Sequence, residues 1–141
     1  MSTTIDSTRF GRIEVAPDSA IDFPHGLAGF DSTRFALIAR AQDDAFVWLH
    51  SLEDPALALP LVDPRRFFAG FALEPAPAAA DAAIYVTVRA SERLEDFTAN
   101  LRAPIVIAGG IGRQVLNEAP SAELRAPLFA ELAAASAEQA A

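Results

Sequence analysis

The segment Phe46–Pro64, FVWLHSLEDPALALPLVDP, is the most informative part of this chain, because its first half is apolar on two faces. In an extended chain, alternate side chains point to opposite faces. One face here carries Phe46, Trp48 and His50, and the other carries Val47, Leu49 and Ser51. A strand with two largely apolar faces is covered on both sides, as in a closed or sandwiched sheet. We therefore expect Trp48, with Phe46 and Leu49, at the centre of the core.

A second strand follows after an acidic turn. Glu53-Asp54-Pro55 ends the first run, since proline fixes its own φ and disfavours the α region for Asp54. The next run, Leu57–Val62, alternates leucines and ends at the turn Asp63-Pro64. Pro60 lies inside it and has no N–H for a ladder, which predicts an edge strand or a bulge.

Short alternating runs continue along the rest of the chain, separated by turns about every 8 to 12 residues, a spacing typical of an all-β barrel or sandwich. The further strands predicted from these runs are 10–15, 20–23, 34–40, 84–88, 97–101, 105–107 and 113–116. The glycines at 109, 110 and 112 predict a hairpin turn rather than a phosphate loop, because a strand follows them instead of a helix. We expect an all-β, mainly antiparallel, barrel-like domain with short helical turns.

Composition sets the domain boundaries and the expected compartment. A chain of 141 residues is long enough for one domain that buries about two-thirds of its unfolded surface. We expect a flexible N-terminus at 1–8, a β-domain at 9–128, and an alanine-rich tail at 129–141 that is partly helical or disordered. The chain has no cysteine, no signal-peptide pattern and no apolar run approaching a membrane span of about 20 residues. These features favour a soluble, cytoplasmic protein.

The charge balance favours protein partners over nucleic acid. The formal net charge is −8, and all 11 basic residues are arginine. A phosphate backbone would be repelled by this average field, so direct nucleic-acid binding is disfavoured. An acidic surface attracts basic proteins, although acidity also serves solubility alone.

Catalytic and metal patterns are sparse. His50 with Glu53, Asp54 and Asp63 could form a metal or metabolite site, but each aspartate precedes a proline and is typical of a turn. Ser51 adjoins His50 in sequence, yet adjacent strand residues face opposite sides, which disfavours a hydrolytic pair. We therefore expect no enzyme and no cofactor, with the metabolite- or metal-binding barrel as the alternative.

The order of motifs resembles the FliW family of flagellar assembly factors. Five segments carry the resemblance: Phe10-Gly11-Arg12-Ile13, Ile21-Asp22-Phe23-Pro24-His25-Gly26-Leu27-Ala28-Gly29-Phe30, Phe46–Pro55, Pro60–Pro64 and Thr98–Ile105. Gly112–Val115 matches the last strand of the pattern. The similarity extends from Phe10 to Leu116 with the order intact.

The resemblance implies a protein that acts by binding. It implies that the chain binds flagellin in the cytoplasm in a chaperone-like way. It also implies binding of the translational regulator CsrA, a basic RNA-binding dimer, which relieves repression of flagellin translation. From the acidic turns we expect Asp43, Asp44, Glu53 and Asp54 to contribute to the approach of CsrA, and we expect a monomer when no partner is bound.

Overall fold

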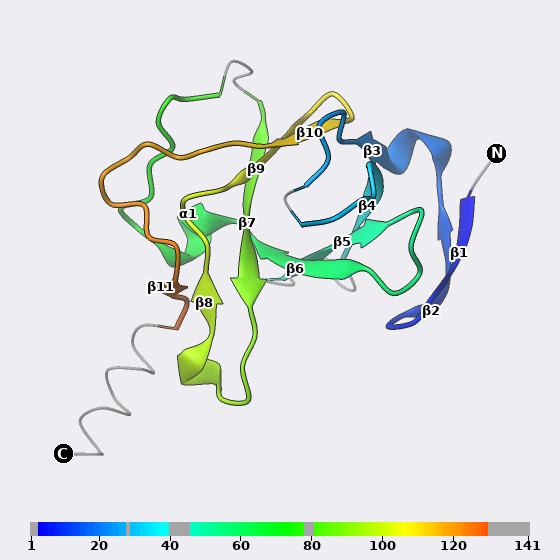
Figure 1. Ribbon diagram of the computed structural model, residues 1–141, viewed down its shortest axis with the longest axis horizontal. Coiled ribbons are helices and arrows are strands. Elements are labelled where there is room, and N and C mark those ends of the chain that lie inside the picture. The colour runs from blue at the N-terminus through cyan, green and yellow to red at the C-terminus, as the bar shows by residue number, and fades with distance from the viewer. Residues whose placement is uncertain (1–2, 28, 40–45, 78–80, 130–141) are drawn as a thin grey trace.

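The strands curl into a barrel, with a separate N-terminal hairpin packed at one side (Figure 1). The computed structural model describes residues 3–27, 29–39, 46–77 and 81–129. The strands are β1 Thr3–Ser7, β2 Gly11–Val15, β3 Ala20–Asp22, β4 Arg34–Ile38, β5 Val47–Ser51, β6 Ala58–Val62, β7 Ala83–Arg89, β8 Thr98–Ala99, β9 Ile105–Ala108, β10 Ile111–Gln114 and β11 Ala126–Pro127. One helical turn, α1 Pro64–Phe67, and 3-10 turns at Pro17–Ser19 and Leu94–Asp96 complete the described elements. None of these helices is long and apolar enough to cross a membrane.

Within the described residues, seven strands close the barrel in the order β7, β6, β5, β4, β3, β10 and β9. The circle is completed where β9 pairs with β7, through Ile84 opposite Val106. Strands β3 and β10 run parallel, and the other neighbours in the circle are antiparallel. The predicted all-β, mainly antiparallel, barrel-like fold is confirmed.

The barrel interior is filled by large apolar side chains from the inward-facing strand positions and from the segment after β3. This core comprises Ile21, Phe23, Leu27, Phe35, Leu49, Leu61 and Ile105. Leu49 pairs with Leu37 on β4 and with Leu59 on β6, so the register of three strands brings leucines together. Burying each such side chain contributes about 1.5–3 kcal/mol, so the inward face of β5 is central to stability.

A second apolar cluster lies outside the barrel, where β8, β11 and α1 cover the outer face of β6 and β7. Val62 and Val86 are fully buried in it. Phe129 packs here too, with ring centroids 6.1 Å from Phe67 and 5.9 Å from Phe97. The sequence had assigned Phe129 to the alanine-rich tail, but its aromatic ring joins it to the domain. The rest of that segment, 130–141, lies outside the described residues.

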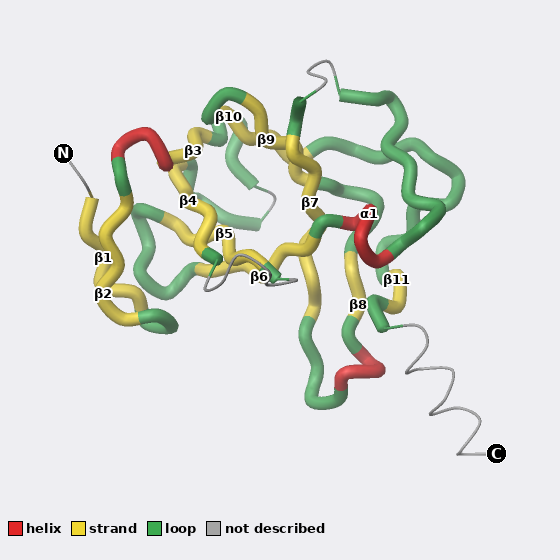
Figure 2. The backbone as a smooth tube through the Cα atoms, turned by 180° about the vertical axis from the view of Figure 1, so that it is seen from behind, coloured by secondary structure: helices red, strands yellow, loops and turns green. Residues whose placement is uncertain are grey.

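The first residues form a strand where a flexible N-terminus was predicted. β1 pairs antiparallel with β2 along its whole length, from Thr3 opposite Val15 to Ser7 opposite Gly11. Ile5 is buried with Val15 and Ala36 in a third apolar cluster. Figure 2 shows this hairpin on one side of the barrel and β8 and β11 on the opposite side. The pairing with β2, the buried Ile5 and the hydrogen bond of Ser7 to His50 connect the segment to the rest of the fold.

Trp48 lies outside the barrel core, in contrast to the prediction. Only the Val47–Leu49–Ser51 face of β5 points inward, so the tryptophan lies on the outer face and is partly buried. The ring of Phe10 lies edge-on to it at 5.5 Å, and Arg9 Cζ lies 4.6 Å from its ring centroid. The β1–β2 turn therefore covers Trp48, and β5 has apolar cover on both faces as predicted.

Pro60 lies in β6 at a position where its missing N–H is tolerated. β6 is paired on both sides, so the predicted edge position is wrong, but its pairing with β7 begins at Leu61. The missing N–H of Pro60 thus costs no bond to β7.

Gly109 and Gly110 link β9 to β10 with φ of 60° and 76°, the two positive values that a type I′ hairpin turn requires.

Candidate partner-binding site

The acidic turn between β5 and β6 forms one wall of a shallow depression of about 590 Å³. The loop that precedes β4 forms the opposite wall. The depression is lined by Gly29, Phe30, Asp31, Ser32, Glu53, Asp54, Ala56 and Leu57. Three of these residues are carboxylates and none is basic, so the depression attracts cationic groups.

Glu53 ties the two walls together. Its Oε1 accepts hydrogen bonds from the backbone N–H of Thr33 at 2.7 Å and of Arg34 at 3.0 Å. These donors, the Thr33 N–H first, lower the pKa of the Glu53 carboxyl below its ordinary value of 4.5. The carboxylate is exposed and stays ionised, but it also holds the loop before β4 against the turn.

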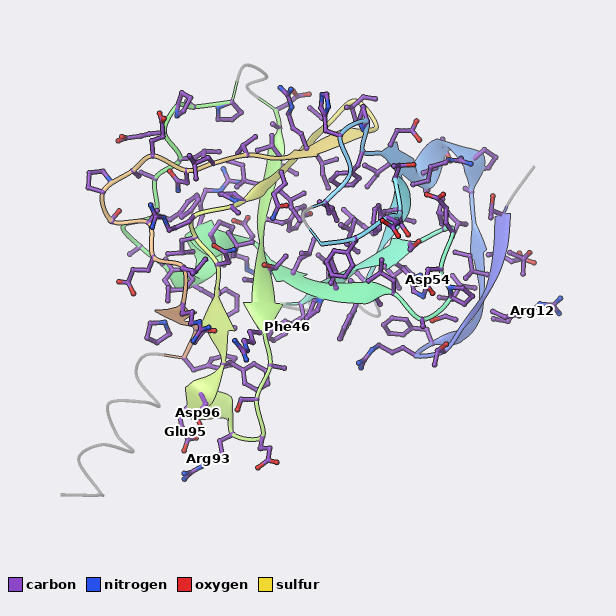
Figure 3. All side chains as sticks on the ribbon, in the orientation of Figure 1. Arg12, Phe46, Asp54, Arg93, Glu95 and Asp96 are labelled. Atoms are coloured by element: carbon purple, nitrogen blue, oxygen red, sulfur yellow. The ribbon has the colours of Figure 1, made fainter. Side chains whose placement is uncertain are left out.

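Ser51 and Asp54 shape the turn itself. The buried Ser51 hydroxyl accepts from the backbone N–H groups of Glu53 and Asp54, both at 2.9 Å, and donates to Ser32 Oγ at 2.7 Å. Asp54 Oδ1 accepts from the N–H of Ala56 at 3.0 Å, as expected of an aspartate in an Asp-Pro turn. Figure 3 shows Asp54 on this turn, near the β1–β2 hairpin. Its second carboxylate oxygen extends the acidic surface.

His50 is fully buried and points away from the acidic turn, under the β1–β2 hairpin. Its Nδ1 lies 2.8 Å from the Ser51 carbonyl oxygen, which can only accept, so Nδ1 carries the proton. Nε2 then accepts from the Ser7 hydroxyl at 2.7 Å, while Ser7 Oγ accepts from the N–H groups of Arg9 and Phe10. Both ring nitrogens of His50 are therefore occupied by structural hydrogen bonds. The contact with Ser7 could not be predicted from the sequence, because 43 residues separate the pair.

The residues suggested for a metal or hydrolytic site are not brought together. The Asp63 carboxylate caps α1 by accepting from the Arg65 N–H at 2.9 Å. His50 contacts only the backbone carbonyl of Ser51, and the Ser51 hydroxyl bonds to Ser32 instead of to the imidazole. The Asp63 carboxylate also acts on Tyr85. Burial is the main cause that raises the pKa of the Tyr85 hydroxyl above its ordinary value, and the negative charge of Asp63 raises it further. Among the described residues, no three His, Asp or Glu side chains are placed to hold a metal ion. Of the four predicted partner-binding residues, Asp43 and Asp44 lie outside the described residues, and Glu53 and Asp54 share the acidic depression.

Comparison with known proteins gives a consistent result over most of the chain. The family profile described as FliW protein matches residues 4–128. The chain is 33% identical over 139 residues to the flagellar assembly factor FliW of Moorella thermoacetica, covering 89% of this chain and 87% of that protein. It is 34% identical over 138 residues to the same factor of Natranaerobius thermophilus, covering 89% and 91%. A solved crystal structure of the flagellar assembly factor FliW superposes with a TM-score of 0.79 at 28% identity, covering 89% of this chain and 96% of that one.

Proposed function

The chain belongs to the FliW family of flagellar assembly factors, and from that membership we propose that it binds two proteins in the cytoplasm, flagellin and CsrA. The observation that carries the proposal is the family match across residues 4–128, together with an acidic depression suited to a basic partner. The chain acts by binding and not by catalysis, because its buried histidine and serines serve the fold.

The CsrA arm of the proposal is supported by electrostatics. The whole chain carries a net charge of −8, and Asp31, Glu53 and Asp54 gather on one depression. CsrA is a basic RNA-binding dimer, so complementary fields accelerate encounter and orient the partners. Holding CsrA in this way keeps it from the flagellin message and lifts the repression of translation.

The two partners make the protein a titration switch. When flagellin accumulates, it occupies the protein and CsrA is released to repress flagellin translation. When flagellin is secreted, the protein is free to hold CsrA again. A switch of this kind needs each partner to lower the affinity of the protein for the other, and linkage makes the two effects equal in free energy.

The test is co-elution in size-exclusion chromatography of the full chain with CsrA from the same organism, and separately with its flagellin. We expect a complex with each partner, and we expect added flagellin to displace CsrA. Light scattering of the protein alone should give the mass of a monomer. Failure to bind CsrA would remove the regulatory arm, and failure to bind either partner would overturn the proposal. A ternary complex with undiminished affinities would exclude the switch.

A further inference from the structure

The outer face of β9 and β10 forms the floor of an apolar groove of about 420 Å³. Gly112 faces the barrel core, where a Cβ built on it would meet the ring of Phe23. Because side chains alternate along a strand, Ile111 and Arg113 point away from the core. Arg113 is paired with Val106 on β9, so that valine belongs to the same outer face. We call this depression the outer groove.

One wall of the outer groove is the segment 73–77, which is held in place by Asn117. The Asn117 side chain is buried, donates from Nδ2 to the Ala72 carbonyl oxygen at 2.8 Å, and accepts at Oδ1 from the Glu74 N–H at 3.1 Å. The N–H of Glu118 donates to the Glu74 carbonyl oxygen at 2.8 Å. These bonds tie the wall to the chain that follows β10. The outer groove is therefore formed before any ligand arrives, as binding pockets usually are.

The lining of the outer groove is aliphatic apart from two side chains. Arg113 is its charged residue, and His25, on the loop after β3, is its other polar side chain. The remaining lining residues are alanine, isoleucine, leucine, proline, valine and one glycine, and no described carboxylate is among them. Arg113 forms no salt bridge with another described residue. In a chain of net charge −8, this groove thus presents a cation on an apolar background.

Two of the lining side chains leave apolar surface in water. Ile111 is 46% exposed and Leu116 is 65% exposed. Covering such surface is favourable, since it removes apolar area from water. Arg113 is exposed too, and a long arginine side chain lays its aliphatic stem on apolar surface while its guanidinium stays in water. An anionic group can therefore meet Arg113 at the edge of the groove while an aliphatic body covers Ile111 and Leu116.

We propose that the outer groove binds a small molecule made of an aliphatic chain and a single carboxylate. The carboxylate pairs with the Arg113 guanidinium, which offers two parallel N–H donors, and the chain lies between β10 and the segment 73–77. At about 30 Å³ for each water-sized group, the groove holds about a dozen non-hydrogen atoms, the size of a medium-chain carboxylate such as decanoate.

A peptide segment fits the outer groove less well. Its buried N–H and C=O groups need hydrogen-bond partners, and the aliphatic side chains of the lining offer none. A ligand whose only polar group is its head avoids that cost. The inference is independent of the proposed function, because neither CsrA nor flagellin enters it.

The test uses decanoate and decanol as probes, which share a chain and differ in charge. We expect decanoate to bind about tenfold or more tightly than decanol in isothermal titration calorimetry, because the charge-assisted bond to Arg113 is made only by the carboxylate. In amide NMR spectra, decanoate should shift the signals of residues 73–77 and 106–116. Both probes are kept below the concentration at which they form micelles.

Three variants locate the binding. Arg113→Gln should weaken decanoate binding by about tenfold and leave decanol unchanged. Arg12→Gln makes the same charge change on the β1–β2 hairpin, where Figure 3 shows Arg12 pointing away from the barrel, and should change neither affinity. Ala108 lines the outer groove, so Ala108→Leu fills part of it and should weaken both probes several-fold. Thermal melts of each variant verify that the fold is retained.

Each contrary result overturns the inference. Equal affinity of decanoate for the original chain and for Arg113→Gln would exclude the head-group contact. Signal shifts at the other apolar depressions, or no binding of decanoate at all, would exclude the outer groove as its site. A dimer of the free protein that Ala108→Leu dissociates would assign the groove to a second copy. Binding of CsrA and of flagellin is measured separately, and its failure would leave these outcomes unchanged.

Discussion

Gly112 leaves no space for a side chain on β10. A Cβ built at this position would lie 2.6 Å from Cε2 and 2.7 Å from Cε1 of Phe23, whose ring is fully buried in the barrel core. We predict that Gly112→Ala destabilises the protein by about 1–3 kcal/mol, because the ring must move within a closely packed interior. Urea unfolding followed by circular dichroism measures the change in free energy of unfolding.

The matched control for this substitution is Gly70→Ala. Nothing lies within 4 Å of a Cβ built at Gly70, and its φ is not positive. We expect a change within about 0.5 kcal/mol. Equal losses for the two variants would show that contact with Phe23 is not the cause.

Glu53 makes the free energy of unfolding depend on pH in the acidic range. Its pKa is lowered in the folded state, chiefly by the N–H of Thr33, so the ionised form stabilises the fold. This contribution is complete above the unfolded pKa near 4.5 and is lost as the pH falls through the lower folded value. In Glu53→Gln the amide oxygen can still accept from Thr33, but the charge is absent. We predict that the difference in melting temperature between the original protein and this variant shrinks as the pH drops from 6 to about 3. A constant difference over that range would contradict the assignment.

The β1–β2 hairpin is held to the barrel by a few identifiable contacts. Ser7 Oγ links His50 to the backbone of the hairpin turn, and Phe10 and Arg9 lie over Trp48. We predict that Ser7→Ala costs about 1–3 kcal/mol, because His50 Nε2 and two N–H groups lose their partner. Since Trp48 is the sole tryptophan, its emission should shift to longer wavelength as the turn lifts from the ring. Amide hydrogen exchange should accelerate in residues 3–15.

Ser51→Ala is the control for the hairpin. It removes a hydroxyl that is also buried, from the neighbour of His50, but that hydroxyl holds the acidic turn and Ser32. We expect faster exchange at residues 52–57 and unchanged Trp48 emission. If Ser51→Ala lifts the hairpin as readily as Ser7→Ala does, the link through Ser7 is not what holds it.

The sequence was most informative where alternation was dense. The Phe46–Pro64 segment contains β5, the acidic turn and β6 as predicted, because most positions there are apolar. β1 was missed because its sequence, TTIDS, has a single apolar residue, and β11 was missed because its two residues are too short for any period. The strand predicted at 97–101 contains β8, which is only two residues long. Trp48 was misplaced because alternation shows that two faces exist but not which one points into the barrel.

Only one side of the candidate site could be predicted from the sequence. Glu53 and Asp54 were identified in a turn from local chemistry, and they lie there. The opposite wall of the depression, around Thr33, is 20 residues away in sequence and is brought close by the pairing of β4 with β5. The exposure of Leu116 and Leu124 has no local signature either, because in the sequence they resemble core leucines.

At the scale of the whole molecule, negative charge is in excess, with a formal net charge of −8. Three carboxylates, Asp31, Glu53 and Asp54, line the acidic depression, and no basic residue lines it. A basic protein that approaches this chain is therefore attracted most strongly near that depression.

The acidic depression should control the rate at which CsrA associates. Asp54→Asn removes one charge but keeps the Oδ1 atom that accepts from the Ala56 N–H, so the turn is preserved. We predict that this variant slows association by roughly twofold to fivefold at low salt, and that the difference disappears near 0.5 M salt, where the Debye length is only about 4 Å. Dissociation should change little, because the charge acts mainly during encounter. Stopped-flow mixing over a series of salt concentrations measures both rates.

The matched control is Asp96→Asn. It makes the same charge change on the turn between β7 and β8, where Figure 3 shows Asp96 well away from Asp54. If steering depends on net charge alone, the two variants will slow association equally. If it depends on the acidic depression, Asp54→Asn will slow association more than Asp96→Asn does, since exposed charges beyond a Debye length are screened. An association rate that neither variant changes at any salt concentration would remove the depression from the encounter with CsrA.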